Sequence, residues 1–120
     1  MRGAAHGSVE WVSEHRVVVT TTDSAAAARG IAERLVRARL AACVQISGPV
    51  ESIYRWDGAV VRDQEWQCWV KTTADRVDEL TDWLVENHDY DVPEVLALPV
   101  LGGNPAYLSW VTAETRPDDA

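Results

Sequence analysis

Thiol, imidazole and carboxylate side chains give this sequence its clearest chemical potential. Cys43 lies in an apolar segment, and a later polar segment, HDYDVPE, carries His88, Asp89, Asp91 and Glu94. A thiolate with an imidazole favours Cu or Zn, whereas carboxylates alone favour harder divalent ions. The sequence therefore predicts a divalent-cation site formed by Cys43, His88 and Glu94, with Cu(II) as one candidate ion.

The same side chains also have a purely structural interpretation, and the sequence leaves both interpretations open. His88 follows a predicted helix, where its ring nitrogens can cap the last carbonyl groups. Cys43 has the character of a small buried apolar residue. Cys68, the only other cysteine, is also in a predicted strand, and the pair lacks CxxC spacing. Two buried, reduced thiols are the expectation under this interpretation.

Aromatic and cationic side chains indicate a second kind of site. Tyr54 and Trp56 lie on the outgoing arm of a predicted hairpin, Lys71 lies on the returning arm, and Tyr90 lies in the polar segment. Side chains two residues apart on a strand face the same side. A cleft between protomers lined by these residues suits a small anionic or planar ligand. The structural alternative is a bridge from Lys71 to a carboxylate that fixes the register of an oligomer.

The element that must position these groups is a long β-hairpin across residues 39–73. Asp57-Gly58 separates two β-prone runs and favours a tight turn with positive φ. An arm over residues 42–56, even if broken at Gly48-Pro49, reaches roughly 45 Å at about 3.3 Å per residue. A domain of this length has a radius of gyration of only about 14 Å. We therefore expect the hairpin to project beyond its own domain.

A projecting apolar hairpin needs a cover that one chain cannot supply. The predicted interface comprises Ile53, Trp56, Val61 and Trp66. Trp suits such a surface because it combines a large apolar body with an N–H donor, and the chain has six Trp and no Phe. Further copies of the same chain are the simplest cover, so the sequence predicts an obligate homo-oligomer.

The remaining pattern predicts a strand, helix, strand, strand, helix, strand order followed by a short helix. The run RVVVTTT at 16–22 predicts a buried strand, and residues 25–40 predict a helix with a buried stripe of Ala27, Ile31, Leu35 and Ala38. Gly30 lies inside this helix, and we expect it to allow close approach to the sheet.

Later segments complete this arrangement. Thr73 is the predicted cap of a second helix that runs to about His88, residues 94–101 form the last strand, and Asn104-Pro105 begins the short helix. The fold class is α+β, a ferredoxin-like βαββαβ sandwich. We divide the chain into a flexible extension at 1–14, one domain at 15–116 and a tail at 117–120.

Composition excludes several classes of function. A net charge of −8 argues against binding nucleic acid through its phosphates, and no apolar run approaches the length of about 20 residues that spans a bilayer. The N-terminus lacks a secretory signal, so we expect a cytoplasmic protein. There is no GxSxG, P-loop, dinucleotide fingerprint or HExxH motif, and we predict that the protein is not an enzyme.

Five segments, in order, resemble one family, the CutA or CutA1 divalent-cation tolerance proteins. They are RLAACV at 39–44, SIYRWDG at 52–58, Glu65 with WVKTT at 69–73, HDYDVPE at 88–94, and YLSWV at 107–111. The resemblance implies a ferredoxin-like protomer in a tightly packed homotrimer, related in architecture to the PII signalling proteins. It also implies binding of copper or other divalent ions and a part in metal tolerance.

The sequence departs from the family pattern at three positions. Asp89 stands where members commonly have Pro, and Thr21 and Trp83 align with cysteines that some copper-binding members carry. The leading hypothesis is a trimeric protein of divalent-metal response that binds Cu or similar ions weakly. The alternatives are a PII-like sensor with a small metabolite or anion in the intersubunit cleft, and a non-catalytic trimeric scaffold.

Overall fold

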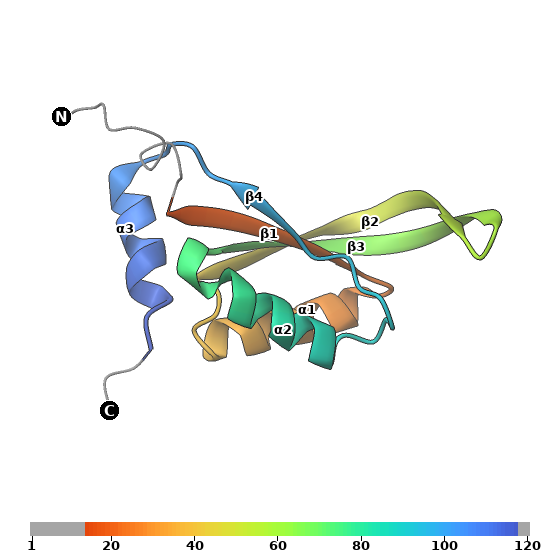
Figure 1. Ribbon diagram of the computed structural model, residues 1–120, viewed down its shortest axis with the longest axis horizontal. Coiled ribbons are helices and arrows are strands. Elements are labelled where there is room, and N and C mark those ends of the chain that lie inside the picture. Colours follow the sequence, from red (N-terminus) through yellow and green to blue (C-terminus); the bar gives the residue numbers. More distant parts are fainter. Residues whose placement is uncertain (1–13, 118–120) are drawn as a thin grey trace.

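The computed structural model describes residues 14–117, and within them it confirms the predicted order of elements. The elements are β1 (His15–Thr22), α1 (Ala25–Arg37), β2 (Cys43–Trp56), β3 (Ala59–Thr73), the 3-10 helix η3 (Ala74–Arg76), α2 (Val77–Asn87), β4 (Leu96–Pro99) and α3 (Pro105–Glu114). The strands form one antiparallel sheet in the order β2-β3-β1-β4. Helices α1 and α2 cover one face of it, and α3 lies at one end (Figure 1). This is the predicted ferredoxin-like α+β fold.

The hairpin formed by β2 and β3 projects well beyond the two helices, as predicted (Figure 1). Asp57 and Gly58 both have positive φ, 53° and 81°, which confirms the tight turn. The pairing of the two strands shifts between Ser47 and Val50. The molecule is 51 Å long with a radius of gyration of 16.1 Å, above the roughly 14 Å of a compact domain of this length.

The core lies between the sheet and the two helices. Buried side chains of both layers form it: Val18, Ala28, Ile31, Leu35, Leu40, Ala41, Cys68, Val70, Leu80 and Leu84. The predicted stripe on α1 is wrong at its ends, because Ala28 is buried while Ala27 is half-buried and Ala38 is exposed. Gly30 is exposed, and a Cβ there would meet nothing within 4 Å, so its predicted close approach to the sheet is also wrong.

Two helix starts were predicted, and one of them differs in the structure. The Asn104 side chain accepts from the Ala106 amide with Pro105 in the first turn, which confirms the start of α3. Thr73 instead precedes the short helix η3, and its hydroxyl donates to the Asp75 carboxylate at 2.5 Å and makes no capping bond. The Thr73 hydroxyl thus bonds to a side chain and not, as predicted, to a backbone amide of the helix.

The described domain begins with Glu14, whose carbonyl accepts from the Ala74 amide at 2.7 Å. The rest of the predicted extension at 1–14 and of the predicted tail at 117–120, apart from Glu14 and Pro117, lies outside the described residues. Within the described part of the chain, no helix is both long enough and apolar enough to cross a membrane.

Candidate functional site

A chain of hydrogen bonds joins β1, the segment after α2, and β3. His88 ends α2, and its Nε2 lies 2.7 Å from the Thr21 carbonyl oxygen. The Tyr90 amide donates to His88 Nδ1 at 3.0 Å. A carbonyl can only accept and an amide N–H can only donate, so the imidazole is the neutral tautomer with its proton on Nε2. Both ring nitrogens of His88 are therefore engaged inside the protomer.

This series of hydrogen bonds continues from Tyr90 to a buried carboxylate. The Tyr90 hydroxyl donates to Glu65 Oε2 at 2.8 Å, and Glu65 is only 8% exposed. Burial, reinforced by the bond to Glu65, raises the pKa of Tyr90, so the phenol remains a donor at neutral pH. Burial and the neighbouring Glu65 also raise the pKa of Glu94. The charge of Glu65 thus acts on Glu94.

Cys43 occupies a different part of the molecule. It is half-buried at the start of β2 and pairs directly with Lys71 across the β2–β3 ladder. His88 reaches Thr21, which pairs with Gln67, four residues from Lys71 on the same strand. Four residues of β3 span about 13 Å. Cys43 and His88 therefore lie too far apart to share an ion within one protomer.

The structure does not bring the three predicted metal ligands together. Over residues 14–117, no three His, Cys, Asp or Glu side chains are grouped so that they could hold one metal ion. His88 is committed to hydrogen bonds and Cys43 lies elsewhere, which leaves Glu94, whose pKa responds to the charge of Glu65. The structural interpretation of His88 needs one correction: its ring binds a strand carbonyl, and its backbone amide is the group that caps α2.

The predicted ligand-cleft residues are also spread along the protomer. Tyr54 and Trp56 lie near the hairpin turn, where the Tyr54 hydroxyl donates to the Asp63 carboxylate. Lys71 lies ten residues along β3 from Val61, the partner of Tyr54, and its ammonium donates to Gln45 Oε1 at 2.6 Å. These three side chains do not line one cleft within a protomer.

The predicted interface residues divide into two groups. Ile53 and Trp56 are 57% and 58% exposed near the hairpin turn, and Val61 is half-buried. Trp66 packs against the core of its own protomer and lies over Gly48, where an added Cβ would approach its Cδ1 to 2.6 Å. Trp66 therefore holds the bulged strand in place within one chain.

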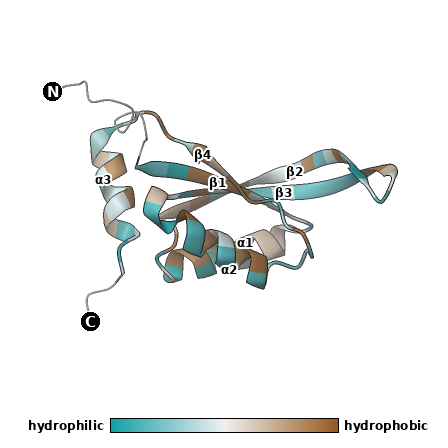
Figure 2. Ribbon diagram, viewed as in Figure 1, coloured by the Kyte–Doolittle hydropathy of each residue, from teal (hydrophilic) through white to brown (hydrophobic). Residues whose placement is uncertain are grey.

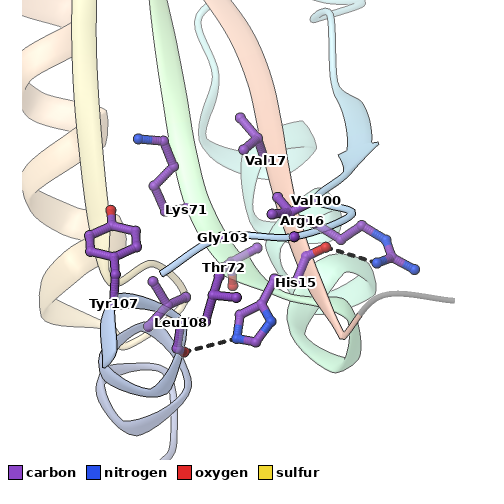
Figure 3. A pocket seen from close by; sticks show the side chains of 11 residues that line it. His15, Arg16, Val17, Lys71, Thr72, Val100, Gly103, Tyr107 and Leu108 are labelled. Atoms are coloured by element: carbon purple, nitrogen blue, oxygen red, sulfur yellow. Dashed lines mark hydrogen bonds between the residues drawn. The ribbon is translucent and has the colours of Figure 1, made fainter. Parts of the chain in front are cut away.

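A cavity of about 220 Å³ lies between β1, β3 and α3, and the sequence did not predict it (Figure 3). Val17 and Lys71 line it from the sheet, Val100 from the loop after β4, and Tyr107 and Leu108 from α3. The available signal was the largely apolar segment YLSWV shortly after Gly102-Gly103. Only the packing of α3 across the end of the sheet creates the hollow.

Comparison with known proteins identifies the family. Residues 16–114 match the family described as CutA1 divalent ion tolerance protein. The chain belongs to the CutA1 family. It is 48% identical over 99 residues to the divalent-cation tolerance protein CutA of Thermus thermophilus, a match that covers 82% of this chain and 96% of that protein.

Other CutA1 proteins agree in structure and differ in length. The solved structure of the Thermus thermophilus protein has a TM-score of 0.83 at 46% identity and covers 85% of this chain and 99% of that one. The chloroplastic CutA of Arabidopsis thaliana is 42% identical over 100 residues, which is 83% of this chain and 55% of the relative. This chain therefore spans just over half the length of that plant relative. The family is named for ion tolerance and not for a reaction.

Two positions at which the chain departs from the CutA1 pattern make contacts within the protomer. The backbone carbonyl of Thr21, a group that any residue supplies, accepts the His88 proton, and the Trp83 ring lies under the guanidinium of Arg34, whose Cζ is 4.8 Å from the ring centroid. A cation over an indole contributes about 0.5–1 kcal/mol at an exposed site. Both positions therefore support packing within the protomer.

Proposed function

We propose that this protein acts in divalent-cation tolerance as a homotrimer that binds cations weakly. The observation that carries the proposal is the match to the CutA1 family along the whole folded domain. The Thermus thermophilus relative, at 48% identity, carries the name divalent-cation tolerance protein. A net charge of −8 favours the accumulation of cations over anions around the chain.

The cation-binding groups we propose are the carboxylates of Glu94 and Glu65, with copper(II) as a candidate ion. Glu65 is nine-tenths buried, and burial together with the charge of Glu65 raises the pKa of Glu94, so a cation bound near both carboxylates would relieve repulsion as well as gain ligands. Two carboxylates form an incomplete coordination shell for any divalent ion. Binding by one protomer is therefore weak, and tighter binding requires ligands from another copy.

Calorimetric titration of the purified protein with Cu(II), Zn(II) and Ni(II) tests this proposal. We expect Glu94→Gln to weaken binding at least severalfold, because it removes one of two charged ligands. Glu86→Gln is the matched control, since Glu86 is exposed near the end of α2. Absence of heat with all three ions, or equal binding by the two variants, contradicts the assignment. Growth of a host that lacks its own CutA, in copper-supplemented medium, tests tolerance separately.

The homotrimer is supported by two apolar surfaces that residues 14–117 leave exposed. Ile53, Trp56 and Val60 are more than half exposed near the hairpin turn, while Leu96 and Leu98 are exposed on β4. Figure 2 shows brown stretches in both regions, interrupted by teal along the hairpin. Strand β4 is an edge of the sheet, and exposed edges attract further strands. The hairpin of one copy can cover the edge strand of the next, and a closed ring of three uses both surfaces.

Native mass spectrometry and light scattering test the assembly. Trp56→Glu should dissociate it, because an unpaired charge in a desolvated interface costs several kcal/mol. Val85→Glu is the control, since Val85 is 55% exposed on α2, away from the hairpin. A wild-type monomer, or an unchanged mass for Trp56→Glu, contradicts the proposed interface. Trp66 is unsuitable as a probe because it packs in its own protomer.

We also propose a binding role, not a catalytic one, and a location in the cytoplasm. The main support for the binding role is that both ring nitrogens of His88 are occupied and Cys43 lies apart from it, so the two do not form a nucleophile and base pair. Both cysteines are free thiols, which suits a reducing compartment. Fractionation of cells that express the chain tests the location.

A further inference from the structure

We propose that the cavity between β1, β3 and α3 is a binding site for a small carboxylate with an apolar body. This inference goes beyond cation tolerance, because it concerns a different part of the molecule and a ligand of opposite charge. The cavity lies at the α3 end of the sheet, whereas Glu65 pairs with Val50 toward the hairpin. We call it the α3 cavity.

The walls of the α3 cavity select an apolar ligand body. Val17, Val100, Leu108 and Val111 supply aliphatic surface from the sheet, the loop after β4 and α3. A volume of about 220 Å³ is below the range of about 300–1,000 Å³ that suits drug-sized ligands. The site therefore fits a molecule of a few carbon atoms or a single ring.

The charge of the lining is opposite to that of the protein. Among the described residues, no carboxylate lines the α3 cavity, although Asp and Glu outnumber Lys and Arg by 19 to 11 in the sequence. His15, Arg16 and Lys71 all contribute to the wall. The guanidinium of Arg16 extends to the side of the cavity away from Lys71 and Tyr107 (Figure 3). Lys71 is the only lysine of the chain and the cation on the Tyr107 side.

Lys71 and Tyr107 provide the donors for an anionic head group. The Lys71 ammonium gives one hydrogen bond to Gln45, so two of its three protons remain for a ligand. Burial and the adjacent Cys43 thiol raise the pKa of Tyr107, which keeps its hydroxyl protonated at neutral pH. An ammonium and a phenol on one side of an apolar hollow match a carboxylate with a hydrophobic tail.

Two sets of bonds hold α3 in place over the sheet. His15 Nε2 lies 2.9 Å from both the Leu108 carbonyl and the Thr112 hydroxyl oxygen. Arg116, just beyond the helix, donates to both carboxylate oxygens of Asp75, at 2.7 and 2.9 Å. The wall formed by α3 is therefore positioned before a ligand arrives, which lowers the entropic cost of binding.

Hexanoate is the probe that we would use, with hexanamide and hexylamine as neutral and cationic counterparts of equal length. Because Lys71 is the only lysine, the side-chain NMR signal of a lysine-labelled sample reports this residue alone. We expect hexanoate to shift that signal and the amide signals of Gly102 and Gly103, which line the cavity. Hexanamide should bind at least about tenfold more weakly, as expected for loss of a charge-assisted hydrogen bond.

Variants locate the head group. Lys71→Met should weaken hexanoate binding about tenfold and leave hexanamide binding unchanged, while Tyr107→Phe should weaken it less because the ammonium remains. Arg55→Met is the control, since Arg55 is an exposed cation near the hairpin turn. Three results overturn the proposal: no shift of the Lys71 signal at millimolar hexanoate, equal binding of hexanoate and hexylamine, or an equal loss in Arg55→Met. If Lys71→Met does not fold, Tyr107→Phe and the three ligands still decide the outcome.

Discussion

Replacement of Tyr90 by Phe tests the hydrogen-bonded chain through His88, Tyr90 and Glu65 most directly. The hydroxyl donates at 2.8 Å to a carboxylate that is only 8% exposed, so Tyr90→Phe leaves a nearly buried charge without this donor. A hydrogen bond to a charged group contributes about 1.5–3 kcal/mol. The free energy of unfolding should fall by that amount. For 120 residues this corresponds to a decrease of about 6–12 °C in the melting temperature of a protomer.

The pH dependence gives a second and independent signature of the same bond. The pKa of Tyr90 is raised above its ordinary value of 10.0, mainly by burial and then by Glu65. A group whose pKa is raised on folding stabilises the fold below its unfolded pKa and loses that contribution as the pH rises further. Wild-type stability should therefore fall more steeply above pH 10 than that of Tyr90→Phe.

Urea unfolding of wild type, Tyr90→Phe, Glu65→Gln and the double variant, at several pH values from 7 to 11, measures both effects. The double-mutant cycle isolates the coupling between the two side chains. Two results refute the reasoning. One is a loss of less than about 0.5 kcal/mol in Tyr90→Phe, as for an ordinary surface change. The other is an identical alkaline slope for wild type and Tyr90→Phe.

Three further predictions concern the scaffold. Gly30→Ala should raise the free energy of unfolding by about 1 kcal/mol, because Gly30 is an exposed helical residue with open space at its Cβ; thermal unfolding checks this, and a loss of stability contradicts it. Gly48→Ala should lower it by about 1–3 kcal/mol, because the new Cβ would lie 2.6 Å from Trp66 Cδ1, and unchanged Trp fluorescence and stability would count against that contact. Hydrogen bonds from Arg116 and Thr73 hold the pKa of Asp75 well below its ordinary 3.8, so their contribution to the free energy of unfolding of the wild type should be lost as the pH falls below about 4. Arg116→Met should be less stable than wild type at pH 7 and should lose less stability on acid titration. Parallel stability curves of the two proteins in acid would exclude the bond.

Much of the fold was predictable because its signals are local. Asp57-Gly58 determines a turn with two positive φ values, and Asn104-Pro105 determines a helix start, in each case through residues adjacent in the sequence. The helix boundaries were less predictable where distant side chains and the helix backbone compete for the same hydroxyl. Thr73 has the residue type of a cap, yet its hydroxyl bonds to Asp75 and Arg116. The second of these partners is 43 residues away, and no local pattern reveals it.

The candidate sites show the same division more sharply. His88 and Glu94 carry metal-binding groups, and the sequence correctly placed them in one polar segment. It gave no indication that the His88 ring spans from the Thr21 carbonyl to the Tyr90 amide, which leaves neither nitrogen for a metal. Glu65 lies outside that segment, and only the bond from Tyr90 shows that it belongs to the same cluster.

By itself, the sequence determined the order of the elements, the reach of the hairpin, the family and the negative charge, because each of these depends on residue type and spacing along the chain. The tertiary structure decided which groups meet. It separated Cys43 from His88, joined Tyr90 to Glu65, and formed a cavity that Lys71 helps to line. Contacts between distant segments depend on sheet register and helix packing, and a shift of one residue in the register of its strand would send Cys43, Glu65 or Lys71 to the other face of the sheet.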